Sequence, residues 1–364
     1  MNATTANETA VLCAAVVDSF ADRYMVWIRV VQILISIAVV PPALLSCLCI
    51  IRAGAVHINM RILLVNLFIS VVLANLGVAV IAIYHLVAFI MHQNEEQLCD
   101  LMAISATSCA RVNALNNYAG LTTVIGLSAL AAERIYATVC FKTYESTRKL
   151  QIGIGLTIAQ WLISFPTLPI RPTSDQRYPV CQGVLSRPRD MFSFMGAMLA
   201  VELFSLFIFV ALVFANEKKI KQYKENAVLQ RLSARYQLKE NVNTTKLMIP
   251  ISVVSCIVFC LSLFALLFLV HDLPRSVELT EESAKVMTDF ARWMELIRLA
   301  APLSTIAFCA AVLYSPHIRH AAKLLLKIDR WPGGRPIQVY DVAIEAEHTK
   351  NVYFEALRKQ WGAA

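Results

Sequence analysis

An adjacent acid and base, Glu133 and Arg134, directly follow an apolar stretch over residues 112–132. An arginine at the edge of such a stretch is costly unless it is paired, and a neighbouring carboxylate can hold it in one conformation and release it in another. The pair therefore predicts a switch, with Glu240 as a second partner for the arginine. The alternative is an arginine that extends toward water and only fixes the depth of its segment.

Several polar side chains stand inside long apolar stretches, where they are expected to face one another because lipid offers them no partner. Glu202 is the strongest candidate for a ligand contact, since a lone carboxylate inside an apolar stretch needs either a protein partner or a cationic or hydrogen-bonding ligand. Glu295 and Arg298, three residues apart on a helix, can simply pair with each other. Interhelical hydrogen bonds without a ligand are the alternative for each residue. The predicted ligand-binding residues are His85, Arg111, Asn113, Asn117, Tyr118, Glu202 and Glu295.

The ten cysteines are too scattered for a disulfide framework, and no C-x-x-C pair indicates a zinc site. Cys13, Cys99, Cys109 and Cys181 fall outside the apolar stretches or at their ends, where an oxidising compartment favours pairing. Cys109 and Cys181 are the predicted disulfide. Cys99 is the competitor for Cys181, and Cys13 is expected to pair with whichever cysteine is left.

Catalytic constellations are not evident. The apolar stretches contain no aspartate, and among the seven histidines only His317 and His320 lie close together. An intramembrane enzyme would need positioned acids, histidines or a nucleophile with its base. We therefore expect no enzyme activity, no metal and no cofactor.

These residues must be positioned by helices that cross a bilayer, because 58% of the 364 residues are hydrophobic and only 16% are charged. A hydrocarbon core needs about 20 apolar residues of helix. Six stretches have that length: residues 30–51, 62–90, 112–132, 150–170, 191–215 and 247–270. A seventh, residues 293–314, carries Glu295 and Arg298 in its first turns. The sequence thus predicts an all-α membrane protein with a bundle of seven transmembrane helices.

The net charge of +8 indicates orientation and no nucleic-acid partner, because the basic residues collect in particular connecting segments. With the N-terminus outside, the inner segments hold about 22 Lys and Arg residues and the outer segments about 10, as the positive-inside rule predicts. Sequons at Asn2 and Asn7 fall outside and are expected to be glycosylated, whereas a third at Asn243 falls inside. We expect a multi-pass protein of the plasma membrane.

The predicted division of the chain is an extracellular arm (residues 1–25), a transmembrane domain (26–328) and a cytoplasmic tail (329–364). After Ser315 and Pro316, apolar and basic residues recur at helical spacing. This pattern predicts a short amphipathic helix on the inner leaflet. A helix packed on protein is the alternative.

Residues 232–241 (LSARYQLKEN) resemble the signature of the nematode serpentine chemoreceptor superfamily, in the branch that holds classes alpha, ab, beta and epsilon. Further segments look like motifs of the same branch: His57-Ile58-Asn59, Glu133-Arg134 with Ala137-Thr138, and Tyr144-Glu145. The resemblance covers residues 54–327 and favours class alpha or ab.

The resemblance implies a rhodopsin-like receptor of chemosensory cilia that binds a small-molecule or peptide ligand and couples to a heterotrimeric G protein. The implied coupling and switch residues are Glu133, Arg134, Lys142, Arg235 and Glu240. The chain departs from the general rhodopsin-like pattern, because its seventh stretch has Pro302 without Asn-Pro-x-x-Tyr and its sixth has Pro250 near the inner end. A ligand-gated channel or small transporter is the rival interpretation, and the lack of an internal repeat speaks against it.

Overall fold

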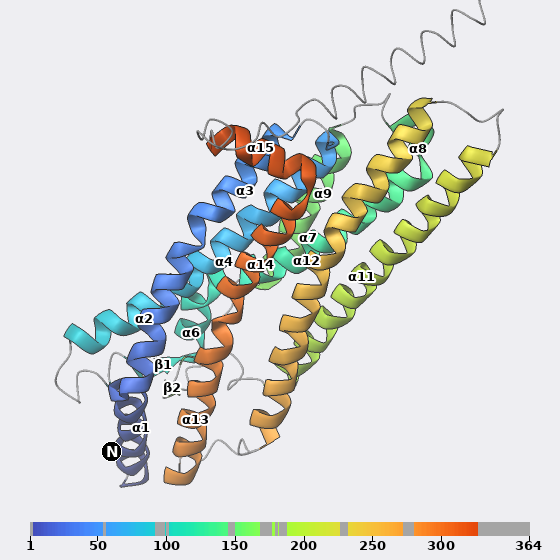
Figure 1. Cartoon of the computed structure of the whole chain (residues 1–364). Helices are drawn as coiled ribbons and strands as arrows, with labels where there is room; N and C mark the ends of the chain where they lie inside the picture. Colours follow the sequence, from blue (N-terminus) through green and yellow to red (C-terminus); the bar gives the residue numbers. More distant parts are fainter. Residues whose placement is uncertain are drawn as a thin grey trace, which may run out of the picture.

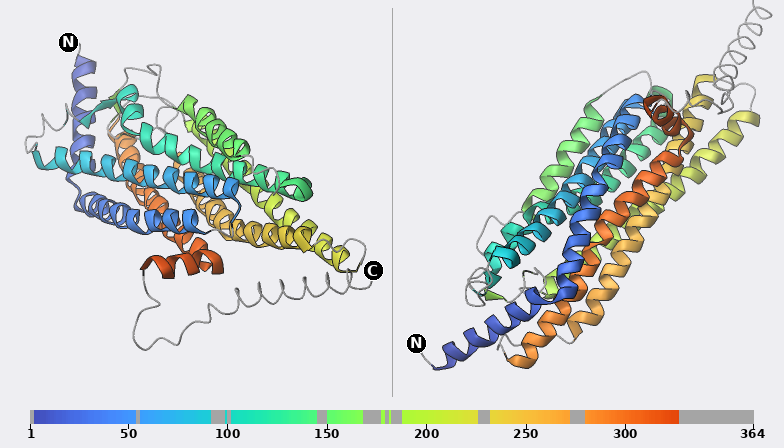
Figure 2. Two further views of the ribbon diagram at one scale, coloured as in Figure 1. Left: turned by 90° about the horizontal axis from the view of Figure 1, so that it is seen from above. Right: turned by 60° about the vertical axis from the view of Figure 1, so that its left-hand side comes forward.

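The computed structural model describes residues 3–53, 56–91, 99, 102–144, 150–167, 177–178, 181, 188–225, 232–271 and 280–326. These residues form an elongated bundle of helices that run along one long axis (Figures 1 and 2). Among the described residues, strands are limited to the antiparallel two-residue pair β1 (Ile104–Ser105) and β2 (Arg177–Tyr178). The predicted all-helical class is confirmed.

Five helical segments of the described chain are long and apolar enough to cross a membrane: Arg23–Arg52, Ile58–Met91, Phe192–Gln222, Leu238–Phe268 and Lys285–Tyr314. They correspond to α2 (Arg23–Ala38) with α3 (Val40–Arg52), α4 (Ile58–Met91), α11 (Pro188–Glu225), α12 (Leu232–His271), and α13 (Glu281–Arg298) with α14 (Ala300–Tyr314). Length and composition therefore identify five candidate spans, and the predicted count of seven spans requires two more helices.

Two further helices occupy the places of the third and fourth predicted stretches. The short α6 (Ala106–Val112) leads through Asn113 into α7 (Ala114–Val139). The fourth helix, α9 (Gln151–Ser164), has only 14 residues and continues as a 3-10 turn, η1 (Phe165–Thr167). Pro166 explains this early end, because proline disfavours helix at the preceding residue and removes a backbone donor. The end of the predicted stretch, 168–170, lies outside the described residues.

Proline also explains the joint between α2 and α3. Pro41 and Pro42 occupy the first turn of α3, where the missing N–H groups cost no hydrogen bond, whereas inside one continuous helix they would break the ladder. At the N-terminus, the predicted arm contains a helix, α1 (Ala3–Ala21).

The amphipathic helix after the last stretch is α15 (Pro316–Leu326), which lies across one end of the bundle (Figure 1). Its buried residues, Ile318, Ala321 and Ala322, belong to the main hydrophobic core, and the helix contacts α3 and α14. Packing on protein, the alternative given above, therefore accounts for its apolar face. We refer to this end of the bundle as the α15 end and to the opposite one as the α1 end.

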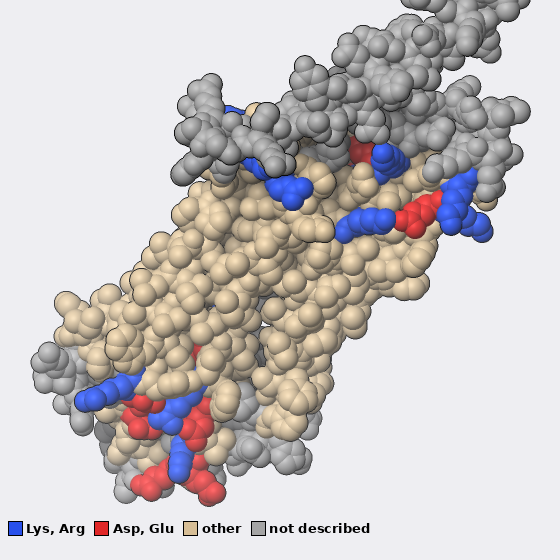
Figure 3. Space-filling model, viewed as in Figure 1, with Lys and Arg blue, Asp and Glu red and all other residues tan. Residues whose placement is uncertain are grey.

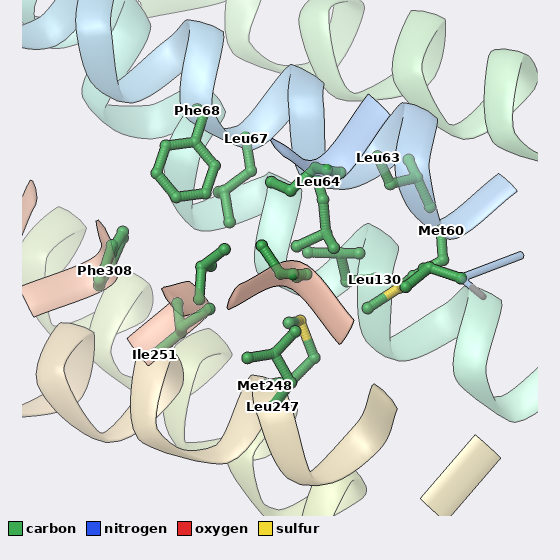
Figure 4. Packing of buried hydrophobic residues seen from close by; sticks show 14 of the residues in the cluster. Met60, Leu63, Leu64, Leu67, Phe68, Leu130, Leu247, Met248, Ile251 and Phe308 are labelled. Atoms are coloured by element: carbon green, nitrogen blue, oxygen red, sulfur yellow. The ribbon is translucent and has the colours of Figure 1, made fainter. Parts of the chain in front are cut away.

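The core is built around α4, whose buried face meets α7, α12 and α14 (Figure 4). On the face shown in Figure 3, charged residues gather toward the two ends, with a broad band of other residues between them. Many large apolar side chains of the long helices are exposed, for example Leu34, Phe207 and Phe264, as expected of a surface that contacts lipid. The charged and polar side chains inside the bundle are the candidates for function.

Candidate functional site

A buried ion pair lies near the C-terminus of α7, at the α15 end. Glu133 and Arg134 are 0% and 1% exposed. Arg134 Nε donates to Glu133 Oε2 at 2.5 Å, and its Nη2 donates to Oε1 at 2.7 Å. Tyr144, in the short α8 (Phe141–Tyr144), donates its hydroxyl to the same carboxylate. The arginine is therefore held inside the bundle and does not extend toward its surface.

The same guanidinium joins α7 to α12. Arg134 Nη1 donates to Thr244 Oγ1 at 2.7 Å and to Asn241 Oδ1 at 3.4 Å, and Asn241 Nδ2 donates to the Ala137 carbonyl at 3.2 Å. Glu240, the predicted second partner of the arginine, accepts from the backbone N–H of His57 at 3.0 Å. Its role as a partner of Arg134 stays a prediction.

The motif residues from distant parts of the sequence meet in this cluster. The His57 ring stacks on Tyr144 with 4.1 Å between centroids, beside the ion pair of Glu133 and Arg134. Burial and the neighbouring Glu133 carboxylate raise the pKa of the Tyr144 phenol well above its usual range, so the hydroxyl remains a donor at neutral pH. We call Glu133, Arg134, Tyr144, Asn241 and Thr244 the arginine cluster.

A second polar cluster lies at the α1 end, where α13 meets α2. Arg298 Nη1 donates to Glu295 Oε1 at 2.6 Å, so the predicted pairing along the helix is present. Gln32 of α2 donates to Glu295 Oε2 at 3.0 Å and to its carbonyl at 2.7 Å. Arg298 Nη2 also donates to Asn113 Oδ1 at 3.2 Å. The cluster therefore links α2 and α13 to the joint between α6 and α7.

Two disulfides lie at the α1 end, and one of them contacts this cluster. Cys109 is joined to Cys181, and Cys13 to Cys99, with Cα–Cα distances of 5.2 Å and 5.0 Å. Asn113 Nδ2 donates to Cys181 Sγ at 3.0 Å, so the first bridge lies directly against the polar residues. The segment that carries Cys181 is thereby tied to α6.

His85 and Arg29 complete this second cluster, and both are 1% exposed. The charges of Arg29, Glu295 and Arg298 all act on the buried His85. Sequence reasoning missed Arg29 and Gln32, although Gln32 is a polar residue within an apolar stretch and was an available signal. We call Arg29, Gln32, His85, Asn113, Glu295 and Arg298 the Glu295 cluster.

The remaining predicted ligand residues do not join this cluster. Arg111 and Asn117 are exposed, and Tyr118 donates its hydroxyl to the Trp161 carbonyl of α9 at 3.0 Å. Glu202 is fully buried between α11 and α12, where Oε1 accepts from Ser255 Oγ at 2.9 Å. The structure therefore does not bring all of the predicted ligand-binding residues together at one place.

Some residues of the predicted glycosylation and G-protein-coupling sites lie outside what the structure describes. They are Asn2 and the side chains of Asn7, Lys142 and Arg235. Among the described residues, no group of three or more His, Cys, Asp or Glu side chains has the arrangement of a metal site.

Comparison with known proteins identifies the family. Residues 12–323 match the family of serpentine type 7TM GPCR receptor class ab chemoreceptors. The chain belongs to this family. It is 28% identical to the serpentine receptor class alpha/beta-14 of Caenorhabditis elegans, over 84% of this chain and 80% of that protein.

Two other proteins of Caenorhabditis elegans are similar to this class ab receptor. The serpentine receptor class epsilon-21 is 30% identical over 42% of the chain and 40% of its own length. The probable G-protein coupled receptor F27E5.8 is 24% identical over 75% and 74%. The superfamily, its branch and class ab are confirmed. The protein is a multi-pass membrane receptor of a chemosensory, G-protein-coupled class, and that class is not enzymatic.

Proposed function

We propose that this class ab receptor binds an extracellular ligand at the Glu295 cluster and activates a heterotrimeric G protein at the α15 end. The observation that carries the proposal is that α7 connects both clusters. Asn113 lies at its start and Arg134 near its end, separated by about 32 Å of helix. A shift of one helix can therefore change both sites together.

The proposed resting state is the one in which Arg134 bonds to α12. Two discrete arrangements are needed for a ligand to act at a distance, and it shifts their populations only through its different affinity for each. A ligand that displaces Arg298 from Asn113 moves the start of α7 and weakens the contacts of Arg134 with Asn241 and Thr244. Separation of α7 from α12 then opens a docking surface for the G protein, to which Lys142 and Arg235 contribute.

For the membrane, we propose that α9 and the α6–α7 pair cross together with the five long apolar segments, which gives seven spans. The N-terminus then lies outside, the α15 end faces the cytosol, and Asn2 and Asn7 carry glycans. The receptor resides in the plasma membrane of a sensory cilium. We keep the predicted division of the chain into an extracellular arm (residues 1–25), a transmembrane domain (26–328) and a cytoplasmic tail (329–364).

The proposed ligand contacts within the cluster are His85, Asn113 and Glu295, together with Arg29 and Arg298. Cationic and anionic groups stand side by side there, which suits a ligand with more than one polar group. Glu202 forms a separate polar site deeper between α11 and α12, and a long ligand reaches it from the first.

To test this proposal, the native receptor and the Arg134→Ala variant are each expressed with a promiscuous G protein. Their signalling responses to the same panel of ligands are then compared. We expect the variant to bind the active ligand but to lose G-protein signalling, because Arg134, once released from Thr244 and Asn241, is itself proposed to contact the G protein. Surface labelling of both proteins controls for expression. An intact response in Arg134→Ala overturns the coupling role, and a ligand-driven current that persists when G proteins are blocked overturns the receptor mechanism in favour of a channel.

A further inference from the structure

A groove lies on the outside of the bundle, in its half toward the α15 end. It runs along α4 between Ile58 and Ile69, with Ile51 of α3 and Thr157 of α9 on its flanks, and has a volume of about 350 Å³. Helices α3 and α9 both pack against α4, and the right-hand view of Figure 2 shows α9 beside α4 at the edge of the bundle. The groove therefore opens toward the surrounding membrane and is not part of either polar cluster.

The length of the groove matches one leaflet of a bilayer. From Ile58 to Ile69 the helix rises about 16 Å, roughly half of a hydrocarbon core of about 30 Å. Ile51 and Ile69 are 52% and 45% exposed, and the lining is almost entirely apolar. An apolar channel of this length suits one acyl chain.

A charged residue stands at the polar end of the groove. Arg61 lies in the first turn of α4 and donates through Nη1 to the Ile51 carbonyl at 3.0 Å. Its Nε is buried and has no hydrogen-bond partner within the described chain, and the same is true of Thr157 Oγ1. A guanidinium with a donor to spare matches a phosphate group, which accepts several charge-assisted hydrogen bonds.

We propose that this groove is a binding site for an anionic phospholipid of the cytoplasmic leaflet, with its phosphate on Arg61 and one acyl chain along α4. The proposal rests on the orientation given above, which places Arg61 at the cytoplasmic boundary, where anionic lipids are concentrated. The lipid fills the space between α3, α4 and α9 and satisfies the Arg61 donor.

The closing experiment measures lipid retention on the purified receptor by native mass spectrometry, in mixed micelles that contain either phosphatidylserine or phosphatidylcholine. We expect one phosphatidylserine to be retained in preference to phosphatidylcholine. Arg61→Gln should lower its occupancy about fivefold, equivalent to about 1 kcal/mol, because it removes one basic group near the headgroup. Arg61→Lys should restore most of it.

Two further variants make the result specific. Arg319→Gln removes the same charge from an exposed position of α15 outside the groove and should leave retention unchanged. Val65→Phe fills the groove without a change of charge and should abolish retention, with the thermal midpoint of the variant as the check on folding.

Equal retention of the two lipids by the native receptor, or an equal loss in Arg61→Gln and Arg319→Gln, overturns the proposal. So does displacement of phosphatidylserine by a sterol, which would show that the groove selects an apolar body without a phosphate. The measurement uses neither ligand nor G protein, so its failure is distinct from a failure of the proposed signalling.

Discussion

The bonds of Arg134 fall into two groups with different consequences. Those to Glu133 stay within α7, whereas those to Thr244 and Asn241 join α7 to α12. A hydrogen bond that involves a charged group contributes about 1.5–3 kcal/mol. The bond to Thr244 is the shorter of the two interhelical contacts, so its loss should weaken the resting state while the ion pair itself remains intact.

We therefore predict that Thr244→Val raises signalling in the absence of ligand. Valine keeps the shape of threonine but cannot accept the hydrogen bond, so the population of the separated state should rise about tenfold or more. The measurement is basal nucleotide exchange on the G protein, normalised to receptor at the cell surface.

Thr245→Val is the matched control for that variant. Thr245 is also buried, but its hydroxyl bonds to the Asn241 carbonyl of its own helix. Its replacement should therefore leave basal exchange close to that of the native receptor. An equal rise in both variants would contradict the role given to the interhelical bond.

At the scale of single residues, the sequence predicted contacts between side chains that are close along the chain, but not contacts between distant ones. The proximity of Glu133 to Arg134, and of Glu295 to Arg298, follows from helix geometry and was foreseen. The contributions of Gln32 and Thr244 depend on how helices rotate about their axes, and the apolar pattern of a lipid-exposed helix does not fix that rotation. Asn113 and Asn117 were grouped by their spacing of one helical turn, and in the structure Asn113 is buried whereas Asn117 is exposed.

Close packing between elements depends on small residues. A Cβ atom added at Gly77 of α4 would lie 2.8 Å from the backbone nitrogen of Asn116 in α7 and 2.9 Å from its Cα. Helices in membranes associate through such approaches, because apolar side chains gain little there from leaving lipid. The pairing of α4 with α7, which positions both polar clusters, therefore requires glycine at this position.

Gly77→Ala is predicted to destabilise the receptor by about 1–3 kcal/mol, because backbone cannot yield to the added methyl group as a side chain would. The measurement is the thermal midpoint of the purified protein in detergent. Gly120→Ala on α7 is the control, since nothing lies within 4 Å of its added Cβ. A midpoint for Gly77→Ala that equals this control would argue against the close approach.

The positions of the helices were largely foreseen, and their ends less so. Hydropathy located the centre of each long helix because the bilayer requires a long apolar segment. It placed the start of the last stretch at residue 293, whereas α13 begins at Glu281. The added turns carry acidic residues, which favour a helix N-terminus but lower hydropathy. The break at Leu299 lies three residues before Pro302, whose missing N–H cannot bond to the Arg298 carbonyl, whereas the break at Asn113 has no proline beside it.

At the scale of the whole molecule, the two charged ends and the band poor in charged residues between them (Figure 3) indicate how the receptor lies in the membrane. The disulfides are at the α1 end and the basic helix α15 is at the other. Disulfides belong to the oxidising side and basic residues to the cytosol, so both features favour the same orientation.

We predict that an epitope at the N-terminus is labelled on intact cells, whereas one at the C-terminus is labelled only after permeabilisation. Replacement of Asn2 and Asn7 together by glutamine should abolish a mobility shift on glycosidase treatment. Asn243→Gln is the control and should leave that shift unchanged. Access to the C-terminal epitope on intact cells would show that the chain crosses the membrane an even number of times.

The hydrogen bond between Arg134 and Thr244 has a consequence for detection. A chemosensory cell must distinguish a few occupied receptors from the spontaneous signalling of many empty ones, and in the mechanism proposed above this bond limits that spontaneous signalling. Each 1.4 kcal/mol of restraint lowers the background about tenfold, and the ligand must supply the same energy to overcome it. In that mechanism, the strength of one contact inside the bundle sets a compromise between the weakest stimulus that can be detected and the rate of signalling without a stimulus.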